Sequence, residues 1–162
     1  MSMTCNLVAI TSDELRALVR NPNRVLDVFF PGDGTWPPAE HHLDLDKMWH
    51  GLHYLLTGTA WDGEPPFSLA ILGGTEIGED TGYGPPRYLT SEEVAQVAAA
   101  LDETPHDAFM ARFEPPAMNR AEVYSGGWEH CDSKYMREHL ARLASFYRKA
   151  ATDGRAVLIC LS

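Results

Sequence analysis

The chain has 162 residues, of which 13 are Lys or Arg and 23 are Asp or Glu, so its formal net charge is −10. Hydrophobic residues make up 44% of the chain and charged residues 22%, which is typical of a folded domain and excludes disordered, collagen-like and coiled-coil chains. No apolar run approaches the roughly 18 residues that a membrane span needs, and the acidic balance argues against general nucleic-acid binding.

The cysteines and the glycine-rich stretch carry no recognisable chemistry. The three cysteines stand alone, and the first residues lack a signal-peptide pattern, so we expect a reduced, cytoplasmic protein of bacterial type. No phosphate-binding G-x-G-x-x-G or G-x-x-x-x-G-K-[ST] pattern is present, and we therefore expect no cofactor.

The first forty residues predict a strand, a helix and a loop. The apolar run Thr4–Ile10 favours a strand, and Thr11 with Glu14 forms a capping-box pattern that starts a helix. Val25–Phe30 is apolar but too short to decide between strand and helix. Pro31–Glu40 is rich in Gly and Pro and predicts a loop.

Leu43–Thr57 carries the clearest helical pattern in the first half of the chain. Its apolar residues recur every three or four positions, and Gly58 stands where a helix C-terminal glycine is expected. Phe67–Leu72 then predicts one or two helical turns. Gly73–Pro86 holds five glycines and two prolines and predicts an irregular loop.

The second half of the chain predicts two strands and three helices. In chain order these are a strand at Arg87–Leu89, a helix that starts with the capping box of Thr90 and Glu93, a helix from Thr104–Pro105 to Phe113 that Glu114–Pro116 ends, a helix at Ser133–Thr152 and a strand at Ala156–Leu161. The last run is apolar throughout, which is typical of a central strand buried on both faces. We therefore predict a single α/β domain over residues 1–162, with a small central mixed sheet and helices packed on both faces in three layers.

A polar stripe follows one edge of the predicted 43–57 helix. Asp46, His50, His53 and Thr57 are spaced i, i+4, i+7 and i+11, which would align their side chains along the helix. Asp and His at this spacing can bind Zn²⁺, Mn²⁺ or Fe²⁺. The pattern is not H-E-x-x-H and no further ligand is identified, so we assign no metal site.

Two other interpretations of this stripe remain open. A His–carboxylate pair can act in acid–base catalysis, although no nucleophile motif such as G-x-S-x-G accompanies it. In the structural interpretation, which we favour, Asp46 stabilises the start of the helix and each His donates one hydrogen bond to a backbone carbonyl.

Three more residues and one loop could belong to a ligand site. Trp61 lies in a loop-like segment, where an aromatic side chain either fills the core or lines a pocket. Tyr83 and Arg87 flank Gly84-Pro85-Pro86 and could pair with an anion or simply hold the loop. The long loop at 73–86 could cover such a site, since long loops often carry function.

Several stretches resemble the YfbM-like family, a bacterial family of small proteins of unknown function. The pattern Leu-Asp-x-Asp-Lys-x-Trp-x-x-Leu-His-x-x-Leu-Thr-Gly at 43–58 carries most of the resemblance. Further similar stretches are Met1–Thr4, Ala70–Gly74, Tyr83–Thr90, Ala121–Tyr124 and Phe146–Tyr147.

The resemblance implies a single α/β domain, in agreement with the fold expected from the pattern. It supplies no activity, substrate, cofactor or catalytic residue. It gives weight to the polar members of the similar stretches, which are Asp44, Asp46, Lys47, His53, Tyr83 and Arg87. Together with Thr57 and Trp61, these residues form our candidate ligand-binding set.

Two hypotheses about function follow. In the first, the chain is an acidic binding module that recognises another protein with a basic surface, as an immunity-type or regulatory protein would. In the second, it is a small-ligand-binding protein or an enzyme, with an Asp/His site on the 43–57 helix covered by the 73–86 loop. The sequence leaves open whether there is catalysis and which oligomeric state the protein adopts.

Overall fold

The computed structural model describes residues 2–162 and is built around a five-stranded sheet in the order β2-β1-β5-β4-β3. The strands are β1 (Cys5–Ile10), β2 (His42–Asp46), β3 (Thr75–Glu76), β4 (Arg87–Leu89) and β5 (Ala156–Leu161). Every pair of neighbouring strands is antiparallel, which corrects the expectation of a mixed sheet. The residues of β5 are apolar throughout because helices cover the strand on both faces. This burial does not depend on whether the neighbouring strands are parallel or antiparallel.

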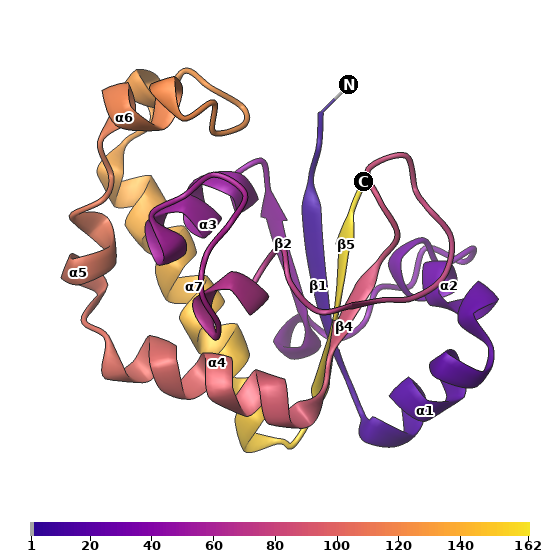
Figure 1. Ribbon diagram of the computed structural model, residues 1–162. Helices are drawn as coiled ribbons and strands as arrows, with labels where there is room; N and C mark the ends of the chain where they lie inside the picture. Colours follow the sequence, from indigo (N-terminus) through magenta and orange to yellow (C-terminus); the bar gives the residue numbers. More distant parts are fainter. Residues whose placement is uncertain (1) are drawn as a thin grey trace.

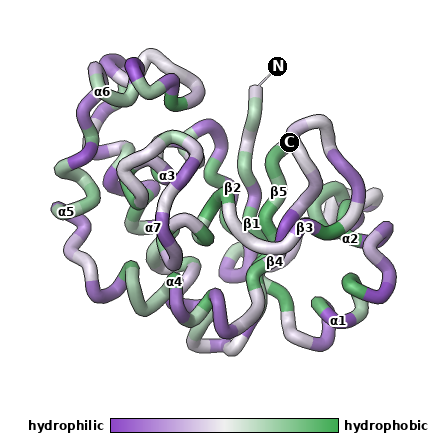
Figure 2. The backbone as a smooth tube through the Cα atoms, viewed as in Figure 1, coloured by the Kyte–Doolittle hydropathy of each residue, from purple (hydrophilic) through white to green (hydrophobic). Residues whose placement is uncertain are grey.

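The last strand, β5, is the centre of the sheet, as its composition predicts. All six of its residues are buried. It pairs with β1 from Cys5↔Leu161 to Ile10↔Ala156, and with β4 on its other side. Figure 2 shows β5 coloured hydrophobic along its length, and Figure 1 shows both chain ends meeting at one end of the sheet.

Seven α-helices lie around the sheet in the described residues. They are α1 (Ser12–Arg20), α2 (Val25–Phe29), α3 (Trp49–Thr57), α4 (Ser91–Glu103), α5 (His106–Met110), α6 (Pro115–Arg120) and α7 (Ser133–Thr152). Figure 1 shows α1 and α2 on one side of the sheet and α3, α4 and α7 on the other. The α/β fold with helices on both faces is therefore confirmed. None of these helices is long and apolar enough to cross a bilayer.

The sheet separates two hydrophobic clusters of unequal size. The larger cluster lies on the α3, α4 and α7 side and includes the fully buried Trp49 and Tyr147. The smaller one lies beneath α1 and α2 and is built from Val8, Val25 and Phe29, among others. A cleft lined by residues of α1, α2 and β1 lies on this side of the sheet.

Capping residues set the helix boundaries much as the sequence predicts. Thr11 and Thr90 each form a complete capping box with the Glu three residues later, and Asp132 caps α7. The helix expected up to Phe113 is shorter, because α5 ends at Met110, before the Glu114–Pro116 stretch. That stretch instead starts α6, because Pro115 stands at the first helical position, where its missing N–H costs nothing.

The predicted 43–57 helix is wrong in its first third. Residues 42–46 form the strand β2, and α3 begins only at Trp49. The segment His42–Asp46 alternates between buried leucines and more exposed polar residues, and this period of two belongs to a strand. Gly58 does end the helix in a left-handed conformation, with φ 78° and its N–H bonded to the carbonyl of Tyr54.

Candidate binding cleft

The four residues of the predicted polar stripe do not share one helix edge. Asp46 ends β2 with a backbone φ of 45°, and its side chain is exposed. His50, His53 and Thr57 lie on α3, where both histidines are buried. The turn between β2 and α3 separates the carboxylate from the imidazoles, so the alignment predicted from the helical spacing is wrong.

His50 joins three segments of the chain. Its Nδ1 accepts a hydrogen bond from the backbone N–H of Tyr124 at 2.8 Å, so Nε2 carries the proton and donates to the carbonyl of Ala60 at 2.5 Å. The ring stacks on Trp49 with centroids 4.7 Å apart and lies 4.2 Å from the ring of Trp61. Burial lowers the pKa of His50, which keeps the imidazole neutral, as this pair of hydrogen bonds requires.

His53 holds the next part of the same loop. Its Nε2 donates to the carbonyl of Asp62 at 2.9 Å, and its side chain is 1% exposed. Its Nδ1 is buried without a hydrogen-bond partner in residues 2–162. Burial lowers the pKa of His53 to about 4. Both histidines therefore fit the structural interpretation, in which each donates to a backbone carbonyl.

Thr57 and Trp61 belong to this same loop attachment. The Oγ1 of Thr57 donates to the carbonyl of His53 at 2.8 Å, in the usual manner of a hydroxyl at the end of a helix. Trp61 remains 59% exposed although its ring faces Trp49 and His50. These contacts hold residues 58–62 across α3.

Asp44 and Lys47 lie on the surface, away from the histidines. The carboxylate of Asp44 accepts the backbone N–H of Asp46 at 2.7 Å, and its carbonyl accepts a hydrogen bond from Arg142 of α7 at 3.3 Å. Lys47 is exposed in the turn that leads to α3. Both residues belong to the candidate ligand-binding set, but the structure does not bring them into one site with His53.

Arg87 lies partly buried on β4 without a carboxylate partner. Its Nη2 donates to the carbonyl of Ile71 at 3.2 Å, and its Nε is buried without a partner in the described chain. Burial lowers the pKa of Arg87, and burial also raises the pKa of the nearby Cys5 thiol. Tyr83 packs against the larger hydrophobic cluster. An anion site formed by Tyr83 and Arg87 stays a prediction.

The 73–86 loop is anchored through Ile77 on the side of the sheet opposite α3, although its Tyr83 packs against the larger hydrophobic cluster. The Oγ1 of Thr81 donates to the carbonyl of Leu161 at 2.7 Å, and Ile77 is buried in the smaller hydrophobic cluster beneath α2. Gly78 approaches the carbonyl of Pro22 so closely that a Cβ would lie 3.2 Å from it. Since α3 lies on the other side of the sheet (Figure 1), this loop does not cover the histidines as expected.

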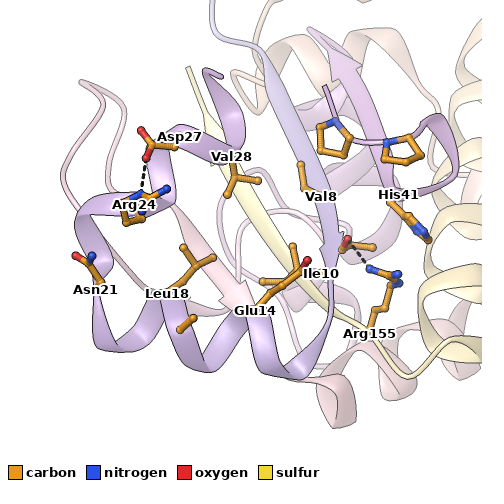
Figure 3. A pocket seen from close by; sticks show the side chains of 14 residues that line it. Val8, Ile10, Glu14, Leu18, Asn21, Arg24, Asp27, Val28, His41 and Arg155 are labelled. Carbon is orange, nitrogen blue, oxygen red and sulfur yellow. Dashed lines mark hydrogen bonds and ion pairs between the residues drawn. The ribbon is translucent and has the colours of Figure 1, made fainter. Parts of the chain in front are cut away.

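A cleft with a volume of about 840 Å³ is lined by residues of α1, α2 and β1. Val8 and Ile10 of β1 form its floor, Leu18 and Val28 line the helix side, and His41 lines the opposite side. Figure 3 shows His41 and Arg155 facing the α1–α2 pair across this floor. The cleft thus combines an apolar base with polar side chains at its rim, as binding sites commonly do.

The charges around the cleft are nearly balanced. Arg24 and Asp27 form an ion pair at 2.7 Å on the helix side, which Figure 3 marks with a dashed line. Glu14 also lines the cleft, and Arg155 reaches in from the start of β5, with its Nη1 3.5 Å from the carbonyl of Ala9. The strongly acidic character of the chain is therefore located elsewhere on the surface.

His41 has the most unusual environment among the residues that line the cleft. Its side chain is 14% exposed, its Nε2 lies 3.3 Å from the carboxylate of Glu40, and its Nδ1 is buried without a partner in residues 2–162. No motif singles out this histidine, because, apart from Pro37 and Pro38, the other residues that line the cleft are distant from it in sequence. Only the pattern of Pro37 and Pro38 before it signals a fixed turn at this place.

No cluster of metal-binding side chains is present in the described residues. Within 2–162, no three His, Cys, Asp or Glu side chains come together in a way that could hold a metal ion. Trp36 and His42 flank the cleft-lining residues Pro37, Pro38 and His41 in the sequence, and their rings stack with centroids 4.5 Å apart. The Nε2 of His42 is 2.8 Å from the Oδ1 of Asn6.

The fold and the cleft define a small layered α/β protein with an antiparallel sheet. A family model described as "Domain of unknown function (DUF1877)" matches residues 1–160, and the chain belongs to this family. Among solved structures, it is similar to YfbM from Escherichia coli, described as a protein of unknown function. That match has a TM-score of 0.71 and 23% sequence identity, and it covers 98% of this chain and 99% of the other.

The YfbM-like resemblance seen in the sequence is thereby confirmed, and so is the fold that it implied. At 23% identity, the structural match shows the fold alone. No curated protein sequence matches the chain. The function must therefore be inferred from the surface of this protein itself.

Proposed function

We propose that this protein is a binding module for another protein, and that the partner inserts an apolar segment into the cleft beside α1 and α2. The single observation that carries the proposal is a cleft of about 840 Å³ with an apolar base, whose walls include the half-buried Leu18 and Val28. Binding sites are commonly concave, with an apolar lining and a few polar groups.

Exposed apolar side chains that are close in sequence to cleft-lining residues support this assignment. Val19 follows Leu18 on α1 and is 49% exposed, Phe30 follows α2 and is 53% exposed, and Trp36 precedes Pro37 and is 44% exposed. Aromatic side chains are enriched at protein interfaces, where they bury a large area at a small entropic cost. A partner seated in the cleft could cover these three side chains as well as the floor.

The charge distribution sets a second expectation about the partner. The rim of the cleft is balanced, while the whole chain carries a net charge of −10. A partner with a basic surface would be attracted over a longer distance before an apolar segment docks, which raises the association rate and makes binding sensitive to salt. Recognition of a basic, immunity-type or regulatory partner remains part of this proposal.

The test uses one variant that fills the cleft and one matched control. Ala17 is exposed on α1 and lines the cleft, so Ala17→Arg places a long charged side chain in the opening. Ala99 is exposed on α4, on the other side of the sheet, so Ala99→Arg makes the same change outside the cleft. Each tagged protein is used to capture partners from the native host at low and at high salt.

We expect one stoichiometric partner with the wild type and with Ala99→Arg, lost with Ala17→Arg and weakened at high salt. Retention of the same partner by Ala17→Arg, in a protein with an unchanged melting temperature, would exclude the cleft as the contact site. A partner that binds equally well at both salt concentrations would exclude long-range attraction between opposite charges.

Binding of a small ligand is the second candidate function, and the volume of the cleft favours it. Small-molecule sites usually have volumes between about 300 and 1,000 Å³ and an apolar lining with a few polar groups. His41 and Arg155 would supply those groups. In that case a fragment library should raise the melting temperature of the wild type and of Ala99→Arg, but not of Ala17→Arg, and no protein partner should be captured.

An enzyme site formed by Asp46 and His53 gains no support from the geometry. The imidazole of His53 is buried and bonded to a backbone carbonyl, whereas Asp46 is exposed at the end of β2. The cleft contains neither residue. The structure therefore directs the search for a ligand to the other side of the sheet.

A further inference from the structure

A second surface, on the edge of the sheet, has the geometry for adding a strand. β2 is the outermost strand and pairs with β1 alone. In an antiparallel pair each residue directs its N–H and C=O to the same side, and the side alternates along the strand. The carbonyl of Asp44 accepts a hydrogen bond from Arg142 of α7, so the backbone of Asp44 faces away from β1. By alternation, His42 also faces outward.

A groove follows this free edge. It lies between β2 and α7 and has a volume of about 470 Å³. Leu43, Ala141 and Phe146 give it an apolar lining, and Arg142 and Lys149 stand on the α7 side. A side chain of an added strand that points to the α7 side would enter this groove, where the aliphatic stems of Arg142 and Lys149 form part of the wall.

The opposite face of the same edge is acidic. Asp44 is exposed, lies between the buried Leu43 and Leu45 and pairs with Asn6, so its carboxylate belongs to the face turned away from α7. Asp46 is exposed at the end of the strand, where a register shift opposite Cys5 breaks the alternation. Side chains on neighbouring strands lie about 5 Å apart, and opposite charges there attract while like charges repel. A strand with Lys or Arg on this face would be stabilised by the carboxylate of Asp44, and a basic residue at the end of that strand would lie near Asp46.

These charges also decide against a second copy of this chain. Two β2 strands that paired edge to edge in antiparallel fashion would bring the aspartates of one copy next to those of the other. Charged side chains on an edge strand are a common protection against such self-association. The edge thus excludes its own copy and remains open to a strand of opposite charge.

We propose that β2 and its groove bind an extended segment of a partner protein in which apolar residues alternate with Lys or Arg. The segment adds a sixth strand next to β2, with its apolar side chains in the groove and its basic side chains beside Asp44 and Asp46. Backbone hydrogen bonds to His42 and Asp44 supply affinity, and the alternating side chains supply specificity. This surface is separate from the α1–α2 cleft, and the proposal stands or falls independently of it.

The experiment is an NMR titration of the ¹⁵N-labelled protein with designed peptides. The probe is the hexapeptide Val-Lys-Val-Lys-Val-Lys with blocked ends, and one control replaces every Lys with Glu. A second control carries N-methyl groups on alternate residues, which removes the N–H groups needed for strand pairing and keeps the charge. Amide shifts are mapped onto the chain, and hydrogen exchange is measured at Asp44.

Charge reversal on the protein completes the test. The variant Asp44→Lys/Asp46→Lys reverses the acidic face of the edge. The matched control Glu103→Lys/Glu114→Lys makes the same change in net charge at exposed positions outside the groove. A third variant, Ala17→Arg, blocks the cleft and separates this proposal from the proposed function.

We expect the Lys peptide to shift amides in residues 42–46 and 141–149 and to slow exchange at Asp44. The N-methylated peptide should bind at least about tenfold more weakly. The Asp44→Lys/Asp46→Lys variant should prefer the Glu peptide, while Glu103→Lys/Glu114→Lys and Ala17→Arg should behave like the wild type.

Three results would overturn the proposal. Shifts spread over the acidic surface, with no effect of N-methylation, would mean non-specific charge attraction. An unchanged peptide preference after reversal of Asp44 and Asp46 would remove the basis for the stated sequence pattern. Peptide binding that disappears with Ala17→Arg would move the site to the cleft.

Discussion

The backbone carbonyl of Asp62 lies 2.9 Å from the Nε2 of His53, and this hydrogen bond holds the 58–62 loop onto α3 from within the core. The imidazole must be neutral there. Its Nδ1 is buried, and within residues 2–162 it has no acceptor to which a protonated Nδ1 could donate a hydrogen bond. The pair therefore makes the attachment of this loop sensitive to acid.

The free energy of unfolding should decrease as the pH is lowered, because of His53. Its pKa is about 4 in the folded protein and about 6.5 when unfolded, so the unfolded state binds more protons between these values. The contribution is complete above pH 6.5 and is lost as the pH falls toward 4, by about 3 kcal/mol in total. His53→Gln keeps a donor for Asp62 but does not titrate. Unfolding in urea at several pH values should show a weaker dependence for this variant between pH 6.5 and 4. Parallel curves for the two proteins would contradict the assignment.

His50 should be more important for stability than for binding. His50→Ala removes the acceptor for the N–H of Tyr124 and the donor to Ala60 and also opens a cavity beside Trp49. We expect a loss of about 2–4 kcal/mol in the free energy of unfolding, since buried polar groups are left unpaired. The exposed His130 offers a matched control, and His130→Ala should stay within about 0.5 kcal/mol. Urea denaturation measures both.

The sequence and the structure agree where a local signal is sufficient. The capping boxes at Thr11 and Thr90 set the starts of α1 and α4, because each is completed by the Glu three residues later. The uniform apolar run of β5 correctly indicates a strand buried on both faces. The period of the apolar residues in 133–152 likewise predicts α7 with its observed boundaries.

They disagree where two periods overlap. In His42–Asp46, the leucines at 43 and 45 fit a strand, yet Leu45, Met48 and Leu52 continue a helical spacing into α3. Pairing with β1 decides the outcome, and that partner is more than thirty residues away in sequence. The predicted polar stripe of Asp46, His50 and His53 required one continuous helix over 43–57. The Asp/His site predicted from that stripe is therefore not formed.

The cleft could not be predicted for a related reason. Its floor comes from β1, its sides from α1 and α2, and the opposite wall from His41 and Arg155. These elements carry no common motif, and only the tertiary fold brings them together. Such a site depends on tertiary packing and has no sequence spacing by which it could be recognised.

Gly51 should tolerate no side chain although it lies inside a helix. A Cβ there would lie 2.5 Å from the Cη2 of Trp128 and 2.8 Å from the Cε of Met136. Alanine favours helices over glycine by about 1 kcal/mol, but the overpacking should outweigh this gain. We expect Gly51→Ala to destabilise the protein by about 1–3 kcal/mol. Gly32→Ala, where no atom lies within 4 Å of the new Cβ, should be nearly neutral. Thermal denaturation of the two variants provides the comparison.

Arg87 provides a direct test of whether a candidate site residue is kept for stability. Its guanidinium has no carboxylate partner, makes one hydrogen bond to the carbonyl of Ile71 and leaves a buried Nε unpaired. Replacing such a group with an apolar residue of similar length usually costs little, because the desolvation of the charge is relieved. We expect Arg87→Met to change the free energy of unfolding by less than about 1 kcal/mol.

Arg112 is the matched comparison for Arg87, because its Nη1 donates to the carbonyls of Leu55 and Leu56 at the end of α3, at 2.7 and 3.2 Å. Arg112→Met leaves both carbonyls without this donor and should cost about 1–2 kcal/mol. If Arg87→Met proves more destabilising than Arg112→Met, the Arg87 guanidinium is a structural element of the β4 surface. If it is neutral, stability does not explain the arginine, and the anion site predicted with Tyr83 becomes the next hypothesis to test by titration with phosphate.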